Sequence, residues 1–415
     1  MAYKREESFV LSFWNYGTMK QQGITEVARW KDLGMNVAMM PWGGSEAEIE
    51  EELPKLMDEL HKNNMKIILK FHDTDDTYYT RHGEDAYRAA FKARYEKYGK
   101  HPAVLGFYPG EEPDTQERAE YYVNTIRVMK EEAPELTPFL EPGDTRKVPG
   151  IGDMLAAAGI SVHGVASYSQ MEPEERGVEE YFGHMHTTLS ACRKHNLDCW
   201  ATLLSSAHYR FQAPEEVDYI WQINTAAALG CTGIFWFRLY DKLMAMDLRG
   251  SPIDEYGQPN GKYYRAMKRA QTRFNIHHAK ILMKLHIKES FFITKRYGGF
   301  PAFPEAGYCG IKRAYCNTDF FGCYEFDPIP GIVSVFDGED GYKYVAVVNN
   351  NRKDAGNITL EFDETVKNVH YVYYNGAQLN GCTTNGYSNK KGDNYIREEI
   401  WLAPGQMEIL RVEKK

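Results

Sequence analysis

The sequence predicts an α/β fold, a (β/α)8 barrel of eight parallel strands followed by a small C-terminal antiparallel β-sandwich. Three observations support this prediction. Eight short apolar runs, separated by segments with helical patterning, occupy the first 285 residues. Most of these runs are apolar throughout, as parallel strands are when helices cover the sheet from outside. After residue 330, short strands separated by Asn, Gly and Asp indicate a sandwich.

The length agrees with this division, because 415 residues accommodate one barrel of about 250 residues and a smaller domain. We predict a catalytic barrel over residues 1–285, a linker with early strands over 286–330, and a β-sandwich over 331–415.

The barrel elements follow from hydrophobic pattern and from start and stop signals. The predicted barrel strands are residues 9–13, 34–42, 65–71, 103–108, 136–140, 160–168, 198–205 and 230–238. The predicted helices are residues 21–33, 45–64, 84–98, 115–132, one starting at Pro173, one starting at Ala213, and 262–285, which closes the barrel. Ser45 with Glu48 three residues later is close to a capping box. The predicted sandwich strands are residues 333–336, 342–348, 358–362, 369–374, 395–402 and 407–412.

Composition excludes several classes of protein. A net charge of -9 argues against a nucleic-acid binder. No apolar run approaches the roughly 18 residues of a membrane span, and the segment 9–13 is too short for the core of a signal peptide. Seven cysteines, an odd number, predict reduced thiols and a cytoplasmic protein, although a secreted chain without its leader would look the same.

Three of these cysteines, Cys309, Cys316 and Cys323, recur in the predicted linker. Zinc sites usually pair cysteines two to four residues apart and add a fourth ligand nearby. We therefore expect free buried thiols, with no metal and no cofactor.

The most informative stretch runs from His101 to Asp114. Its apolar strand stops at a Pro-Gly break, and the carboxylates Glu111 and Glu112 follow at once. Pro113 restricts Glu112 to extended geometry. One interpretation is an acidic turn that caps the next helix. The other is a catalytic carboxylate at the end of a strand.

This stretch resembles strand four of the (β/α)8 glycoside hydrolases of the clan that includes β-galactosidases and cellulases. There, His-Pro and an apolar run precede Asn-Glu-Pro or Asp-Glu-Pro, whose Glu is the general acid/base. The resemblance implies that Glu112 is that acid, with Glu111 at the Asn or Asp position. Such an acid needs a setting that raises its pKa, which Tyr108 and Glu111 could supply.

In such barrels the active site lies where the strands end, because the loops that follow them converge there. Aromatic residues make up 13% of the chain, and their flat rings match the apolar faces of sugars. We therefore expect a carbohydrate cleft for a glycoside, an oligosaccharide or a polysaccharide. The predicted lining is Trp14, Asn15, Trp42, His72, Asp73, Tyr108, Glu111, Glu112, Glu141, Tyr168, His208, Trp236, Arg238 and Asp241.

Glycoside hydrolysis generally needs a second carboxylate. The related clan supplies it as a Glu at the end of strand seven, but no carboxylate occurs between Cys199 and Ala213 here. Asp241, Asp73 and Glu141 are the candidates at other strand ends, and a wide separation from the acid would then predict inversion.

A second hypothesis is substrate assistance. The strand-four doublet is similar to that of barrel hydrolases of the β-N-acetylgalactosaminidase type, with Glu111 in place of Asp. The resemblance implies that Glu111 would orient the acetamido group and that Glu112 would be the acid.

Two rival classes remain. A carbohydrate-binding barrel without catalysis would explain the incomplete carboxylate pair. A metal-dependent hydrolase could use His72, Asp73 and His208, but strand one has no His-x-His pair. We expect a glycosidase that needs no metal. The sugar, the linkage, the anomeric outcome and the oligomeric state are left open by the sequence.

Overall fold

A computed structural model describes residues 8–110, 112–139, 141, 143, 147–172, 175–242, 247–320, 324–325, 327–374, 379–383 and 396–415. The chain divides into two compact units. The first unit comprises Met1–Pro214 and Thr232–Lys268, and the second comprises Glu215–Cys231 and Arg269–Lys415.

The first unit contains eight parallel strands in two four-stranded sheets, in the orders β1-β8-β7-β6 and β2-β3-β4-β5. The backbone N–H of Asn36 donates to the carbonyl of Leu11 at 3.1 Å, so the ends of the two sheets at β1 and β2 meet. This order is compatible with a (β/α)8 barrel. The strands are β1 (Val10–Phe13), β2 (Val37–Met39), β3 (Lys66–Leu69), β4 (Val104–Phe107), β5 (Thr137–Pro138), β6 (Val162–Ala166), β7 (Asp198–Leu204) and β8 (Gly233–Phe237).

One buried cluster receives a side chain from every strand or its end. Neighbouring side chains along a strand point to opposite faces, so a cluster shared by all eight strands indicates a common interior. Its members include Val10, Val37, Ile68, Leu105, Phe139, Val162, Trp200 and Phe235.

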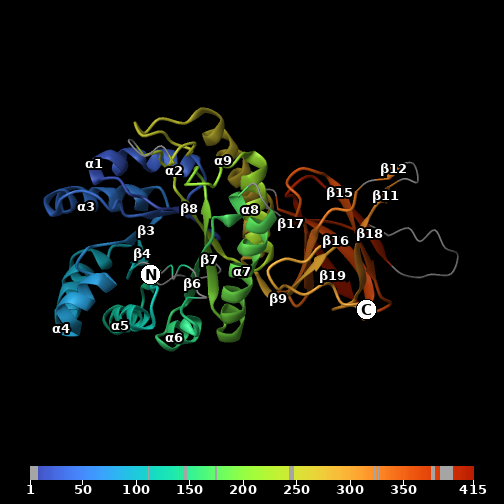
Figure 1. Cartoon of the computed structure of the whole chain (residues 1–415), viewed down its shortest axis with the longest axis horizontal. Helices are drawn as coiled ribbons and strands as arrows, with labels where there is room; N and C mark the ends of the chain where they lie inside the picture. The colour runs from blue at the N-terminus through green and yellow to red at the C-terminus, as the bar shows by residue number, and fades with distance from the viewer. Residues whose placement is uncertain are drawn as a thin grey trace. The chain divides into compact units, whose positions relative to one another are not determined.

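Helices separate the strands, as predicted, and in Figure 1 helices α3 to α7 lie outside β3, β4 and β6 to β8. They are α1 (Met19–Gln22), α2 (Val27–Asp32), α3 (Glu46–Lys62), α4 (Asp76–Arg94), α5 (Gln116–Glu132), α6 (Ile151–Ala157), α7 (Glu175–His195) and α9 (Gly261–Phe274). The Ser45 side chain accepts from the backbone of Glu48 and caps α3. Helix α4 begins earlier than predicted, because Asp75 caps it and Gly83 only kinks it. Helix α6 was not predicted, and Pro173 lies outside the described residues.

The second unit contains a six-stranded antiparallel sheet, β17-β16-β19-β14-β13-β9, and a three-stranded sheet, β10-β15-β18. Residues of both sheets, such as Val345 and Leu360, share one buried core. The predicted C-terminal antiparallel domain is confirmed. Its strands are β9 (Leu285–Ile293), β10 (Ile311–Asn317), β13 (Gly331–Gly338), β14 (Lys343–Asn349), β15 (Gly356–Phe362), β16 (Val366–Tyr374), β17 (Leu379–Thr383), β18 (Arg397–Leu402) and β19 (Met407–Lys414), with a small pair β11 (Asp319–Phe320) and β12 (Tyr324–Glu325).

Helix α8 (Glu216–Ala228) belongs to this second unit, although it follows β7 in the sequence. The indole N–H of Trp221 donates to Asn350 at 2.8 Å, and the Asn224 amide donates to the carbonyl of Gly405 at 2.9 Å. The end of α9, the π-helix η4 (Asn275–Ala279) and α10 (Lys280–Leu282) complete the helical part.

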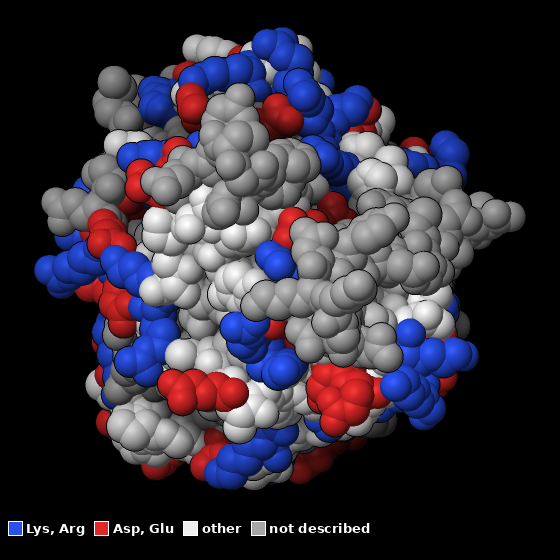
Figure 2. Space-filling view, turned by 90° about the vertical axis from the view of Figure 1, so that its right-hand side faces the viewer, with Lys and Arg blue, Asp and Glu red and all other residues white. Residues whose placement is uncertain are grey.

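Figure 2 turns the right-hand side of Figure 1 toward the viewer, and over its described part basic and acidic side chains lie next to one another. Within the ranges given above, every helix is too short or too polar to cross a membrane.

Candidate functional site

The backbone joins the ends of β4 and β5 at the two carboxylate residues Glu112 and Glu141. The N–H of Glu112 donates to the carbonyl of Glu141 at 3.1 Å. Glu112 is exposed and has a φ of 30°, in the left-handed region that few residues other than glycine adopt. The prediction that Pro113 restricts Glu112 to extended geometry was therefore wrong. Its side chain passes Gly143, where an added Cβ would lie 3.0 Å from the Glu112 Cγ. Glu111 lies outside the described residues.

Glu141 brings a buried carboxylate to the same place. Its exposed fraction is 4%, and the hydroxyl of Thr202, within β7, donates to it at 2.7 Å. The indole N–H of Trp14, just after β1, donates in turn to the Thr202 oxygen at 3.4 Å. Thr202 of β7 thus connects Trp14, just after β1, with Glu141, beyond the end of β5.

Lys70, which follows β3 directly, is the main residue that sequence reasoning missed here. It is only 4% exposed, and its Nζ lies 2.6 Å from the centre of the Trp42 ring and 4.6 Å from that of Tyr108. A cation over aromatic faces is attracted by the negative face of each ring. The ring of Trp14 meets that of Tyr108 edge-on at 5.1 Å. The sequence signal that could have identified Lys70 is its position directly after an apolar strand, at the carboxyl end where the site was expected.

A second aromatic group lies at the ends of β6, β7 and β8. Tyr168 stacks on Phe237 with 5.0 Å between ring centres, and His208 meets Phe237 at 5.1 Å. Burial lowers the pKa of His208. Arg238 is buried 5.0 Å from the Tyr16 ring, and burial lowers the pKa of its guanidinium. Its Nε has no hydrogen-bond partner among the described residues.

Four predicted site residues have local structural roles or face the other side of their strand. Asn15 is buried and bonds the backbone of Gln22 and Gly17 within its own loop. Trp236 is 0% exposed and lies between Phe235 and Phe237 of the interior cluster, so it faces the other side of β8. We therefore omit both from the proposed lining.

The other two are Asp73 and Asp241. Asp73 is paired with Arg94 of α4, with 3.0 Å between Nε and Oδ2. Asp241 accepts from the backbone of Ser251 at 2.8 Å and from the Asn260 amide at 3.2 Å, and burial raises its pKa. His72 is exposed. The carboxylates of Asp73 and Asp241 therefore already have protein partners.

A polar network also missed by sequence reasoning holds the loop that carries Glu112. Buried Asp76 donates its backbone N–H to Pro109 at 2.8 Å, and its carboxylate accepts from Arg118 at 3.2 Å. Arg118 also donates to the carbonyl of Glu112 at 3.3 Å. A Cβ on Gly110 would lie 2.3 Å from the Asp76 carboxylate, so the loop and this aspartate are tightly packed.

In the described part of the chain, no group of three or more His, Cys, Asp or Glu residues could hold a metal ion. Cys309 and Cys316 are free and half-buried, and Cys323 lies outside the described residues. The Cys316 sulfur accepts from the backbone of Ile329 at 3.3 Å. These two thiols therefore have the environment of structural side chains.

No family model and no curated protein sequence matches the chain. Solved structures do resemble it. An α-amylase from Geobacillus thermoleovorans, solved with acarbose, has a TM-score of 0.55 at 11% identity over 100% of both chains. A β-galactosidase from Rahnella sp. R3 has a TM-score of 0.52 at 11% identity over 68% of this chain, and one from Halorubrum lacusprofundi has 0.50 at 12% identity over 64%.

The chain spans less than two thirds of the length of these β-galactosidases, 58% in each case. At such identities the likeness is one of fold, and it agrees with the parallel strands and helices of the first unit.

Proposed function

We propose that the chain is a glycoside hydrolase whose first unit forms a closed (β/α)8 barrel, with Glu112 as general acid/base and Glu141 as the second carboxylate. The observation that carries this proposal is the hydrogen bond from the Glu112 N–H to the Glu141 carbonyl. It brings two carboxylate residues together at the strand ends, where such barrels place their active sites.

Glu141 is a better second carboxylate than the other two candidates. Both oxygens of Asp241 accept hydrogen bonds that fix its own loop, and Asp73 is paired with Arg94. Glu141 lies at the end of β5, next to the loop of Glu112, with Thr202 as a neutral partner. A carboxylate beside the reacting carbon stabilises a developing positive charge on the sugar.

The residues around this pair suit a carbohydrate. Trp42 and Tyr168 are half-buried aromatic residues at these strand ends, and aromatic rings match the apolar faces of sugars. Lys70 and Arg238 add donors at the same strand ends. Glu112 is exposed in the free protein, and a bound sugar would replace the surrounding water, which strengthens electrostatic interactions in the site. We therefore propose a glycoside, an oligosaccharide or a polysaccharide as substrate. Cys192 and Cys231 form no disulfide with the described residues, which supports a cytoplasmic location.

Two alternatives are carried by specific observations. The Glu111-Glu112 doublet favours substrate-assisted hydrolysis of N-acetylhexosaminides, in which Glu111 would orient the acetamido group. The exposure of Glu112 favours a barrel that binds carbohydrate without cleaving it.

The test is turnover of a panel of chromogenic glycosides, N-acetylhexosaminides included, by the whole chain and by Glu112→Gln. A general acid contributes roughly 10²- to 10⁴-fold, so we expect Glu112→Gln to lose about that much kcat. Glu120→Gln is the matched control, because Glu120 is exposed on α5. A chelator should leave turnover unchanged.

The outcomes separate the hypotheses. Full turnover by Glu112→Gln would remove this residue from the mechanism. Sugar binding without turnover of any glycoside would establish the binding barrel. NMR of the first-formed anomer decides the rest. Retention only with acetamido sugars supports substrate assistance, and inversion supports a second carboxylate that activates a water molecule, the role for which Glu141 is the candidate.

A further inference from the structure

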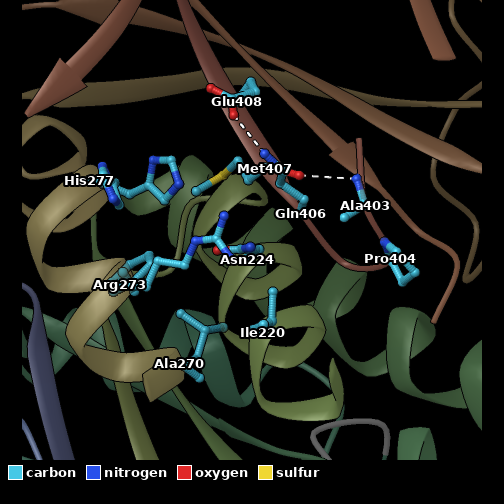
Figure 3. Close-up of a pocket in the computed structure, with 13 residues that line it drawn as sticks. Ile220, Asn224, Ala270, Arg273, His277, Ala403, Pro404, Gln406, Met407 and Glu408 are labelled. Carbon is cyan, nitrogen blue, oxygen red and sulfur yellow. Dashed lines mark hydrogen bonds between the residues drawn. The ribbon is translucent and has the colours of Figure 1, made fainter. Parts of the chain in front are cut away.

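A pocket in the second unit is not used by the proposed function. It lies between α8, the end of α9 with η4, and the turn that joins β18 to β19 (Figure 3). Its volume is about 160 Å³. Pockets for drug-sized ligands occupy roughly 300–1,000 Å³, so this one suits a single small ring.

Hydrogen bonds fix the wall formed by the β18–β19 turn. The Gln406 side chain accepts from the backbone of Ala403 at 3.0 Å and donates to Glu408 at 2.8 Å (Figure 3). The Asn224 amide of α8 donates to the carbonyl of Gly405 at 2.9 Å. Helix and turn are thereby held together, so the pocket is formed before any ligand arrives.

Several polar groups of the lining still have hydrogen-bonding capacity. Among the described residues, no hydrogen bond uses the Arg273 guanidinium, the second carboxylate oxygen of Glu408 or the Asn224 side-chain oxygen. The His278 Nδ1 is buried without a partner. In Figure 3 the Arg273 side chain extends from its helix toward the side of the pocket where Asn224 lies.

The charges of the lining offset one another. Arg273 is cationic and Glu408 is acidic, and burial raises the pKa of Glu408 although the charge of Arg273 lowers it. Burial lowers the pKa of His278 to about 3, so this imidazole is neutral at pH 7. A ligand without net charge fits this balance better than an anion or a cation.

We propose that this pocket binds a neutral polyhydroxylated molecule of monosaccharide size. A guanidinium only donates and a carboxylate only accepts, whereas each sugar hydroxyl does both and can satisfy Arg273 and Glu408 together. Ile220, Phe274 and Met407 give the pocket an apolar wall for the C–H face of the ring. The site is separate from Glu112 and does not depend on the proposed hydrolase activity.

The test is calorimetric titration of the full chain with D-glucose, D-galactose and N-acetyl-D-glucosamine, alongside acetate and L-alanine. We expect one sugar to bind, and Arg273→Met and Glu408→Gln to weaken that binding at least 10-fold. Arg269→Met is the control, because Arg269 is exposed on the same helix, as Arg273 is, but pairs with Glu216 outside the pocket. Differences between variants assign the site even if sugar also enters the barrel.

Three results would overturn the proposal: no sugar binds, both pocket variants bind sugar as the unmodified chain does, or acetate or alanine binds more tightly than every sugar. Glycoside turnover is measured on the same variants. We expect Arg273→Met to keep the kcat of the unmodified chain. The pocket and the hydrolase activity are therefore tested separately, since Glu112→Gln is the variant that tests the hydrolase. Circular dichroism spectra confirm that each variant is folded.

Discussion

At the scale of single residues, Thr202 connects two residues of the candidate site by hydrogen bonds. Its hydroxyl donates to buried Glu141 and accepts from Trp14. Thr202→Val keeps the shape but leaves the carboxylate and the indole without this partner. We expect the free energy of unfolding, measured in urea, to fall by about 1–3 kcal/mol, and kcat to fall with it.

Thr187→Val is the matched control. Thr187 is exposed on α7 and bonds only the backbone of its own helix. Its replacement should change stability by less than about 0.5 kcal/mol. If both substitutions had the same small effect, the hydrogen bond from Thr202 to Glu141 would not contribute to the free energy of unfolding.

Sequence reasoning placed the candidate residues at strand ends but did not identify their polar partners. Trp14, Tyr108 and Glu141 could be placed because apolar strands show where they end. Lys70 and Thr202 could not be predicted as members of the site, because lysine and threonine are mostly exposed in folded proteins. Their roles depend on neighbours from other strands, and one sequence does not reveal which neighbours meet.

At the scale of elements, β4 and β5 are so close at Gly106 that no larger side chain fits between them. A Cβ on Gly106 would lie 1.7 Å from the backbone oxygen of Thr137. We expect Gly106→Ala to force the strands apart, with a loss of stability of about 1–3 kcal/mol or more and a lower melting temperature. Turnover should fall as well, since Glu112 and Glu141 follow these strands.

Gly83→Ala is the comparison for this substitution. A Cβ at Gly83 meets nothing within 4 Å, so only its φ of 80° opposes alanine. The cost should be about 1–2 kcal/mol, without any effect on turnover. Equal losses of turnover in the two variants would contradict the role given to the β4–β5 contact.

The Asp76–Arg118 pair predicts a dependence on pH. Burial raises the pKa of Asp76, and Arg118 opposes that rise. Because the folded pKa lies above the ordinary 3.8, ionisation of Asp76 opposes folding, and stability falls as pH rises through this window. Arg118→Met removes the opposing charge and raises the folded pKa further.

We expect Arg118→Met to cost about 2 kcal/mol at pH 7, and this cost to shrink as the pH falls toward 3.8, where the protonated acid needs no cation. Denaturant unfolding at several pH values measures it. Arg118→Lys should recover part of the loss. A cost that stays constant with pH would mean that Arg118 acts through packing alone.

Element prediction succeeded where the pattern was long and apolar. Strand β7 and helix α5 lie within about a residue of their predicted bounds. Helix α6 was missed, because seven residues after a Pro-Gly break give too short a period to detect. The predicted start of α4 at residue 84 was wrong, because Asp75 caps the helix and Gly83 only kinks it.

At the scale of the whole molecule, no single cut in the sequence separates the two units, because α8 belongs to the second unit but lies between two segments of the first. Its residues Trp221, Asn224 and Asp218 bond Asn350, Gly405 and Arg352. A chain ending at residue 285 would lose all three partners. We expect such a truncated chain to be insoluble or to lack a cooperative thermal transition, measured by circular dichroism, whereas the full chain unfolds cooperatively.

A soluble truncated chain that unfolds cooperatively would show that α8 is stable without the β-domain. The sequence predicted both domains but could not assign α8 to the second, because hydrophobic pattern shows that a helix is buried and not what covers it. Only contacts between residues more than a hundred positions apart carry that information.

The membership of α8 in the second unit has a consequence for synthesis. Asn224 leaves the ribosome 181 residues before its partner Gly405. At a synthesis rate of roughly 5–20 residues per second, the partner residues of α8 are made on the order of 10 to 40 seconds after the helix. During that interval the apolar flank of a nascent helix is open to chaperones, and slow translation of the last strands would prolong its exposure.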